Sequence, residues 1–282
     1  MLDREEYVEQ AYLFRSLGER IRQNTPTQDL LTLAREEVLA TTKLPLAIDF
    51  LASDLRLHGV FSTAMAKLSH YFTPFQTFVI AEAESERGKF DLSVALVMLE
   101  REATYRAEGA TPQGIFLYQF ECLCRNRLGY DRGLEAIAGD GIFDGDWRQW
   151  ILTVRRQVGL KDIADMIYVR SEYYVLQQKL LGRGDEDEPH AVLFGEKEGR
   201  IALANRKKDP LLLFAAMHRQ LGYPEVPRLV PIDETPQQIP MLARRLERAE
   251  ARLKLLEEEQ RGGIDITKFY GQDGRPSWPA EP

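Results

Sequence analysis

Helical periodicity, broken at short intervals by turn residues, is the feature that most limits how this chain can fold. Apolar residues recur three and four positions apart from the beginning of the chain to about residue 181, as in Tyr7, Ala11 and Phe14, which share one face of a helix. Gly, Pro, Asn and Thr residues end the successive periodic segments. The sequence therefore predicts a mainly α fold in which residues 1–181 form an antiparallel array of helical hairpins, similar to an α-solenoid.

Four helix junctions share one arrangement of residues. A turn position is followed at +2 by a large apolar residue, at +5 by a small residue and at +9 by an aliphatic residue. The small residue lets two antiparallel helices approach closely, and the large residue fills the space beside the turn. The four sets are Thr42-Leu44-Ala47-Leu51, Gly59-Phe61-Ala64-Leu68, Gly88-Phe90-Ser93-Val97 and Leu128-Tyr130-Gly133-Ile137.

This arrangement resembles the turn and second helix of tetratricopeptide-type repeats over about residues 30–140, most clearly at Gly88-Lys89-Phe90 and over residues 128–134. The resemblance implies a concave face of helical hairpins that binds a protein segment. Because the four sets do not recur at the repeat's fixed period of about 34 residues, an irregular helical bundle is the alternative.

The sequence changes in character after residue 182. Residues 183–189 are polar and acidic, and two short apolar stretches within residues 191–204 flank a Gly- and Glu-rich segment, which predicts a β-hairpin. With the following helix, capped by Asp209, this hairpin forms a predicted module over residues 182–222. A helical region followed by such a hairpin loosely resembles the PCI-type scaffold with its winged helix, which implies an assembly subunit as one alternative function.

Beyond this module, the sequence predicts a Pro-rich linker over residues 223–236, a coiled-coil helix over residues 237–260 and a flexible tail over residues 261–282. The seam of the coiled-coil helix alternates three and four residues apart: Ile239, Leu242, Leu246, Ala249, Leu253 and Leu256. Charged residues of both signs flank the seam, so we predict oligomerisation or partner binding through this helix. Docking of the helix on its own domain is the alternative.

Composition and missing motifs exclude several classes of function. The 282 residues include 37 Lys+Arg and 44 Asp+Glu, and the net charge of -7 argues against nucleic-acid binding. The sequence contains no His-Glu-x-x-His zinc motif, no Walker P-loop and no Gly-x-Ser-x-Gly elbow, so we predict a non-catalytic protein without metal or cofactor. It also lacks a signal-peptide pattern and a run of about 18 apolar residues, and we expect a cytoplasmic protein without a membrane span.

Two smaller features favour structural roles. Cys122 and Cys124 are two positions apart on a predicted helix and point to different faces, which is typical of small buried side chains rather than metal ligands. The loop from Asp140 to Asp146 looks like a calcium loop but lacks an oxygen ligand at its third position and a Glu at its twelfth. We therefore predict a turn, with Asp146 as the cap of the next helix.

Two groups of basic residues are the candidate binding sites, one at a helix-to-helix turn and one before the Asp209-capped helix. The candidate partner-binding residues are Tyr118, Arg125, Arg127, Arg132, Arg206, Lys207 and Lys208. Such cations can bind an anion or an acidic partner. We therefore predict a cytoplasmic protein–protein interaction scaffold or adaptor. An all-α enzyme or small-molecule binder, with a pocket of Tyr118, Phe120 and Arg125, is the alternative, and nucleic-acid binding through residues 206–208 is a third.

Overall fold

The computed structural model describes residues 2–21, 27–85, 90–182 and 191–228. These ranges contain thirteen α-helices and no β-strand, which confirms the predicted mainly α class. Met1–Leu229 form one compact unit, and Val230–Pro282 form a second unit that lies outside the described residues. The helices are α1 (Arg4–Ile21), α2 (Thr27–Glu37), α3 (Leu44–His58), α4 (Phe61–Lys67), α5 (Pro74–Glu84), α6 (Leu92–Ala107), α7 (Pro112–Asn126), α8 (Tyr130–Ala138), α9 (Gly145–Gln157), α10 (Ile163–Val169), α11 (Glu172–Leu180), α12 (Glu196–Ala204) and α13 (Pro210–Leu221).

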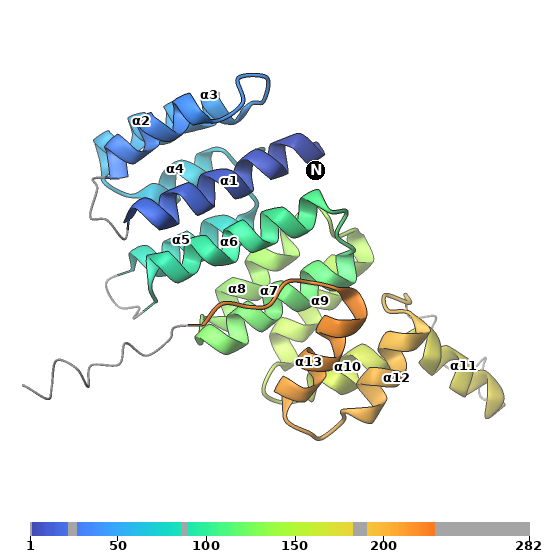
Figure 1. The fold of residues 1–282 in the computed structure, drawn as a ribbon. Coiled ribbons are helices and arrows are strands. Elements are labelled where there is room, and N and C mark those ends of the chain that lie inside the picture. Colours follow the sequence, from blue (N-terminus) through green and yellow to red (C-terminus); the bar gives the residue numbers. More distant parts are fainter. Residues whose placement is uncertain (1, 22–26, 86–89, 183–190, 229–282) are drawn as a thin grey trace, which may run out of the picture. The chain divides into compact units, whose positions relative to one another are not determined.

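The first six helices close on themselves because α1 pairs with α6. Each helix from α1 to α6 packs on the next one along the chain, and α6 returns to form with α1 the most extensive helix–helix interface of the described residues (Figure 1). On α6, Ala95, Leu99 and Ala103 lie four residues apart without exposed surface, and the small alanines permit close packing. The sequence did not predict this pairing of α1 with α6.

α7 is the central helix of the next part of the fold. The Thr111 side chain caps its N-terminus, and residues 114–123 are all buried. The ring of Phe116 stacks on that of Phe120 with 5.7 Å between centroids, and Trp150 of α9 meets Phe116 edge-on at 4.8 Å. These rings form an aromatic core that joins α7 to α9.

The predicted β-hairpin over residues 191–204 is wrong. Phe194 makes an isolated bridge to Ser171, and Glu196–Ala204 form α12. The Glu-rich segment that we interpreted as the hairpin turn is the first turn of this helix, where acidic side chains are favourable. Gly199 allows α12 to lie close to the start of α11, because a Cβ there would be 2.6 Å from the Cβ of Ser171. The winged helix that depended on the hairpin is absent from residues 191–228.

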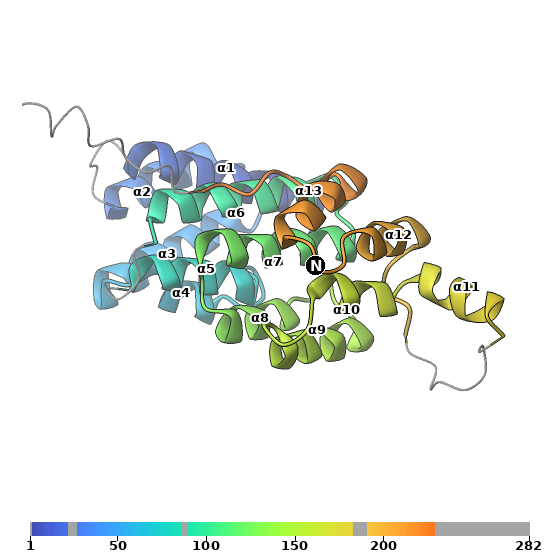
Figure 2. The ribbon, with the colours of Figure 1, turned by 90° about the horizontal axis from the view of Figure 1, so that it is seen from below.

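Residues 223–228, which the sequence assigned to a linker, run as an extended strap over α6 and α7 (Figures 1 and 2). Tyr223 is buried, and its hydroxyl donates a hydrogen bond to Oε2 of Glu121 at 2.8 Å. Nδ2 of Asn126 donates to the carbonyl oxygen of Pro227 at 3.1 Å. The chain therefore stays on the helical unit beyond the end of α13.

Three predictions fall on residues outside the described ranges: the remainder of the linker, the coiled-coil helix over residues 237–260 and the tail over residues 261–282. All six seam residues belong to this part of the chain. Within the described ranges, each helix is too short or too polar to cross a membrane.

Candidate functional site

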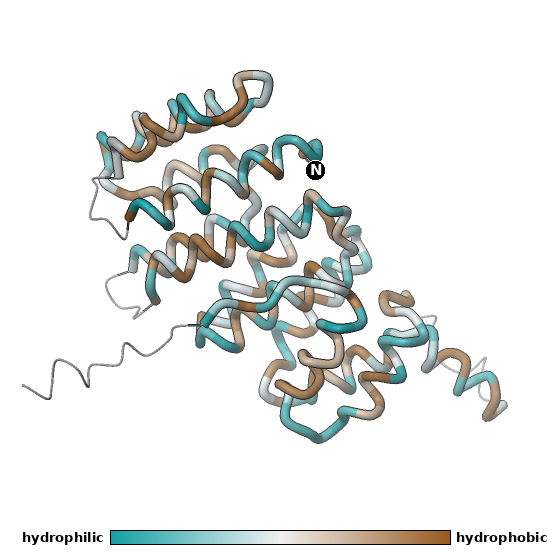
Figure 3. Tube along the Cα trace, viewed as in Figure 1, coloured by the Kyte–Doolittle hydropathy of each residue, from teal (hydrophilic) through white to brown (hydrophobic). Residues whose placement is uncertain are grey.

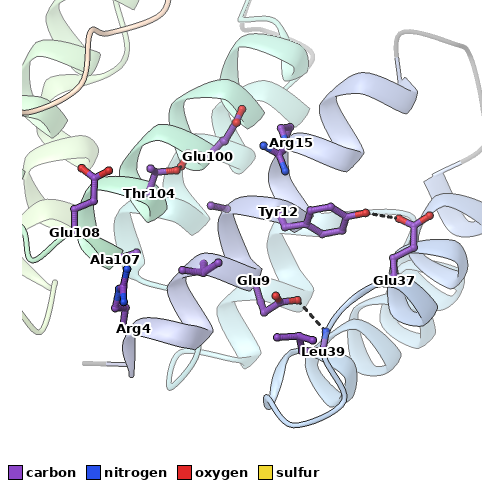
Figure 4. Close-up of a pocket in the computed structure, with 12 residues that line it drawn as sticks. Arg4, Glu9, Tyr12, Arg15, Glu37, Leu39, Glu100, Thr104, Ala107 and Glu108 are labelled. Atoms are coloured by element: carbon purple, nitrogen blue, oxygen red, sulfur yellow. Dashed lines mark hydrogen bonds between the residues drawn. The ribbon is translucent and has the colours of Figure 1, made fainter.

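A groove of about 540 Å³ lies between α1 and α6 and reaches the C-terminal end of α2 (Figure 4). The two helices are antiparallel here, and each lines the groove with residues three and four positions apart. The α1 row is Arg4, Val8, Ala11 and Arg15, and the α6 row is Glu100, Thr104, Ala107 and Glu108. Glu9, Tyr12, Glu37 and Leu39 complete the lining. We name this site the α1–α6 groove.

The two walls of the groove differ in charge. The α1 row places the guanidinium groups of Arg4 and Arg15 on one wall, and the α6 row places the carboxyl groups of Glu100 and Glu108 on the other (Figure 4). Apolar surface lies between them, including Val8, whose side chain is about half exposed. Desolvation raises the pKa of Glu100, and the nearby Arg15 opposes this effect. The groove thus offers opposite charges across an apolar floor, and two further carboxylates, those of Glu9 and Glu37, are hydrogen-bonded at its α2 end.

Hydrogen bonds hold the α2 end of the groove in place. The Tyr12 hydroxyl donates to Oε2 of Glu37 at 2.9 Å, and Nη2 of Arg20 pairs with Oε1 of the same carboxylate at 2.5 Å. These bonds, with that from Arg20 the larger influence, lower the pKa of Glu37. The backbone N–H of Leu39 donates to Oε2 of Glu9 at 2.9 Å. The end of α2 is therefore tied to α1 at two points.

The aromatic residues of the predicted pocket lie in the core. Tyr118 has no exposed surface, and its hydroxyl donates to the carbonyl oxygen of Met98 at 2.8 Å. Phe120 is also buried, and the Arg125 guanidinium donates to the carboxylate of Glu121 one turn earlier. Tyr118 therefore has no surface to offer a partner in this structure.

The other two arginines of this group are on the surface but do not form one cluster with Tyr118. Arg127 ends α7 in a left-handed conformation, with φ of 54°, and is exposed. Arg132 is exposed on α8, with Nη1 3.5 Å from Oε1 of Glu82. A surface ion pair of this kind contributes little to stability, so the Arg132 side chain can exchange Glu82 for a partner's carboxylate. The Arg127 side chain is accessible because it is exposed.

The second basic group is partly neutralised by acidic residues. The Arg206 guanidinium donates to the carboxylate of Asp165. Lys207 has a φ of 58°, and its backbone N–H donates to Oδ2 of Asp162 at 2.6 Å. Lys208 is exposed. The hydrogen bonds of Arg206 and Lys207 thus attach this turn to the N-terminal half of α10.

A buried ionic group, which sequence analysis missed, joins α6, α7 and the loop before α9. It consists of Glu102, Arg106, Gln119 and Asp140, all of which are buried. Arg106 donates to Oε1 of Glu102 through Nε at 3.0 Å and Nη2 at 2.7 Å, and it also pairs with Asp140. Nε2 of Gln119 donates to the same Glu102 oxygen at 2.8 Å. Asp140 is therefore an ion-pair partner in the core as well as a turn residue.

The predicted turn at this loop is present, but the cap of the following helix lies two residues earlier than expected. The backbone N–H of Trp147 donates to Oδ1 of Asp144 at 2.9 Å, so Asp144 rather than Asp146 caps α9. The backbone N–H of Ile142 donates to Oδ1 of Asp140 at 3.1 Å. These bonds account for the aspartates as turn and capping residues.

The buried ionic group has one more negative charge than it can balance if both carboxyl groups are ionised. Burial raises the pKa of Glu102, Arg106 opposes this rise, and Asp140 adds to it. Two buried acceptor atoms, Oε2 of Glu102 and Oε1 of Gln119, have no hydrogen-bond donor among the described residues. A proton on Glu102 removes the excess charge and supplies a donor to this group.

Glu102→Gln should therefore gain stability relative to the wild type as the pH rises from about 5 to 8. The raised pKa of Glu102 stabilises the fold below the carboxyl's ordinary pKa, and this contribution is lost as the pH rises through its folded value. Glutamine keeps the shape and the donor at all pH values. Urea unfolding of both proteins across this range measures the difference. If the stability of the wild type instead increases relative to that of the variant as the pH rises, Glu102 is ionised in the folded protein.

Neither a metal-binding cluster nor a similar known protein indicates a function for the described residues. Among the residues that the structure describes, no group of three or more His, Cys, Asp and Glu side chains could hold a metal ion. Comparisons with protein-family models, with curated proteins and with solved structures found no match. The α1–α6 groove, with its charged and apolar lining, is therefore the candidate functional site.

Proposed function

We propose that this protein is a non-catalytic interaction adaptor that binds an amphipathic helix of a partner protein in the α1–α6 groove. The observation that carries the proposal is the antiparallel helix pair whose exposed rows enclose an apolar floor between walls of opposite charge. Amphipathic helices bind grooves between helices through apolar residues three and four positions apart. A protein–protein scaffold is also the class of function that the sequence favours.

The spacing of the groove residues supports a helix as the occupant. Arg4, Val8, Ala11 and Arg15 are four, three and four positions apart, which is the alternation of residues along a helix–helix seam. Ala11 on one helix and Ala107 on the other are small, so a third helix can approach both. This row extends over about three helical turns, which is longer than a small ligand can contact and suits a helix.

The charges define the flanks of the partner helix. A helix lying along the groove presents one flank to Arg4 and Arg15 and the other to Glu100 and Glu108. The matching partner therefore carries acidic residues on one flank and basic residues on the other. Running the helix in the reverse direction exchanges the flanks, so the charge pattern also selects the direction of binding.

The finer predictions from the sequence fit the same role. The predicted hairpin array would supply the rigid support for the groove, and the predicted coiled-coil helix over residues 237–260 would supply a second contact with the partner or with another copy. A cytoplasmic location is part of this proposal. The enzyme alternative has less support because Tyr118 and Phe120 of its pocket are buried.

Three labelled helical peptides test the proposal by fluorescence anisotropy. Each is about three heptads long with the same leucine seam, and the flanks are Lys on one side and Glu on the other, Lys on both, or Glu on both. The wild type should bind the mixed peptide about tenfold more tightly than either single-sign peptide. The double variant Arg4→Glu/Arg15→Glu has two acidic walls and should instead prefer the all-Lys peptide.

A matched pair of substitutions shows where the peptide binds. Val8→Glu places a charge on the floor of the groove and should greatly weaken binding of the mixed peptide. Leu57→Glu changes an exposed leucine of α3 outside the groove and should leave binding unchanged. Equal binding of all three peptides, no binding of any, or equal effects of Val8→Glu and Leu57→Glu would each rule out the proposal.

A further inference from the structure

α11 is fixed at its N-terminus but is not covered by the rest of the described chain. It packs on α12 and more lightly on α10, and none of its nine residues is buried (Figures 1 and 2). The backbone N–H of Tyr174 donates to Oγ of Ser171 at 3.2 Å, and that of Glu172 donates to the carbonyl oxygen of Phe194 at 2.9 Å. Tyr168 and Tyr174 meet edge-on at 5.3 Å between centroids. These contacts hold the first turn and leave the outward side of the helix unpacked.

The outward side of α11 combines apolar and charged residues in a simple order. Its four exposed residues are Glu172, Leu176, Lys179 and Leu180, which share one face because they lie four, three and one positions apart. Leu176 is 44% exposed and Leu180 is 81% exposed, and Figure 3 shows the alternation of hydrophobic and hydrophilic positions along this helix. We name these four residues the α11 face.

A helix of this length needs a partner for its apolar side. Isolated helices of fewer than about 12–15 residues are marginal in water, and most helical stability in proteins comes from packing of an apolar face. The inner side of α11 has the contacts described above, but its two outward leucines have none that bury them. Exposed apolar patches rimmed by charge are typical of protein–protein contacts.

We propose that the α11 face binds the α11 face of a second copy of this chain, with the two helices antiparallel. About a twofold axis near Leu176, Glu172 of one copy lies opposite Lys179 of the other, and this pair occurs twice. The Leu176 side chains of the two copies then pack between the two ion pairs, and each Leu180 packs just outside them, at the ends of the contact. This inference does not depend on the α1–α6 groove.

Charge complementarity selects a second copy in this orientation. In a parallel pair, Glu172 would lie beside Glu172 and Lys179 beside Lys179, and like charges would repel at both ends. In the antiparallel pair both contacts are attractive, as in the flanking positions of helical seams. A single face thus carries its own complement, which is the requirement for a twofold interface.

The length of α11 sets the expected strength of association. Nine residues span about 14 Å at the rise of an α-helix. Such a contact buries less than the roughly 1,000 Å² expected of a stable interface, so the dimer should dissociate readily on dilution. Its association constant is therefore best measured over a wide range of protein concentration.

Sedimentation equilibrium of the full chain, from micromolar to near-millimolar concentration, tests this inference through reciprocal charge changes. Glu172→Lys and Lys179→Glu should each raise the dissociation constant by about three- to thirtyfold, because each places like charges opposite one another twice. The double variant Glu172→Lys/Lys179→Glu restores both ion pairs with exchanged signs and should return the dissociation constant to near the wild-type value. Leu180→Glu should weaken the dimer, and Leu57→Glu on α3 should not.

Two further measurements separate this contact from other sources of association. Circular dichroism of each variant confirms that the helices are retained. Leu246→Glu alters the predicted seam within residues 237–260 and leaves the α11 face intact. Measuring the α11 charge changes also in the Leu246→Glu background removes association through that seam, and weakening by both single changes with recovery in the double variant there supports the inference. A wild-type chain that stays monomeric throughout, or association that ignores the α11 changes, overturns it.

Discussion

Arg106→Met should lower the free energy of unfolding by about 3–5 kcal/mol. The Arg106 side chain is 1% exposed, and it lies between the carboxyl groups of Glu102 and Asp140, which are equally buried. Burial alone would lower the pKa of Arg106, but the two carboxyl groups outweigh this effect and raise it, so the guanidinium stays charged. Methionine fills most of the volume and removes the charge. The Asp140 carboxylate is then left in the core without its cation, and an unpaired buried charge strongly destabilises the fold.

Urea unfolding followed by circular dichroism measures this loss, with Arg155→Met as the matched control. Arg155 also pairs with two carboxylates, those of Asp131 and Glu135, but on the surface. Exposed ion pairs contribute little because water solvates the separated charges. The control should therefore be much more stable than Arg106→Met. Comparable stability of the two variants would show that the buried ionic group does not hold α6, α7 and the loop before α9 together.

Phe194→Ala should also lower the free energy of unfolding by about 3–5 kcal/mol, but for a different reason. The Phe194 ring is almost completely buried between Trp147 and Trp150, with centroids 5.1 and 5.2 Å away. Truncation removes apolar area from the core and leaves a cavity that two rigid indole rings cannot close. Because the backbone of Phe194 also accepts the hydrogen bond from Glu172, the damage should concentrate on α10–α13.

Hydrogen exchange locates this effect as well as measuring it. In Phe194→Ala, amide protection should fall more in α10–α13 than in α1–α6, whose closed group does not include this ring. Val192→Ala is the control, since Val192 is two residues away and 46% exposed, and it should change global stability by less than about 1 kcal/mol. Uniform loss of protection over all helices would contradict the expected local role.

The sequence predicts the local structure of this chain well where caps and periodicity agree. The helix predicted with Asp209 as its cap is present as α13, and the Asp209 side chain accepts a hydrogen bond from the backbone N–H of Leu211 at 2.9 Å. The hairpin prediction failed because the same features, a Gly followed by Glu and Lys, serve as a turn or as a helix N-terminus. The extended residue Phe194 then docks among tryptophans that are distant in sequence, which no local pattern reveals.

The candidate sites depended on contacts that the sequence does not reveal. The α1–α6 groove exists only because α6 returns to α1, so its two charged walls come from separate parts of the chain. The buried ionic group was missed because Asp140 also serves as a turn residue. Glu102 and Arg106 could have been suspected, since they fall on the same face of α6 as the apolar positions Leu99 and Ala103.

The pairing of α1 with α6 also has a consequence for how the chain is made. During synthesis, α1 emerges before α2 to α6, yet its main partner is complete only when the ribosome has passed Ala107. At about 5–20 residues per second, the interval is on the order of ten seconds. Throughout that time the apolar side of α1, with Leu13, Phe14 and Leu17, lacks its final cover. Until then α1 exposes an apolar side of the kind that chaperones bind, and the first six helices can close only after α6 is made, while residues beyond Ala107 are still being added.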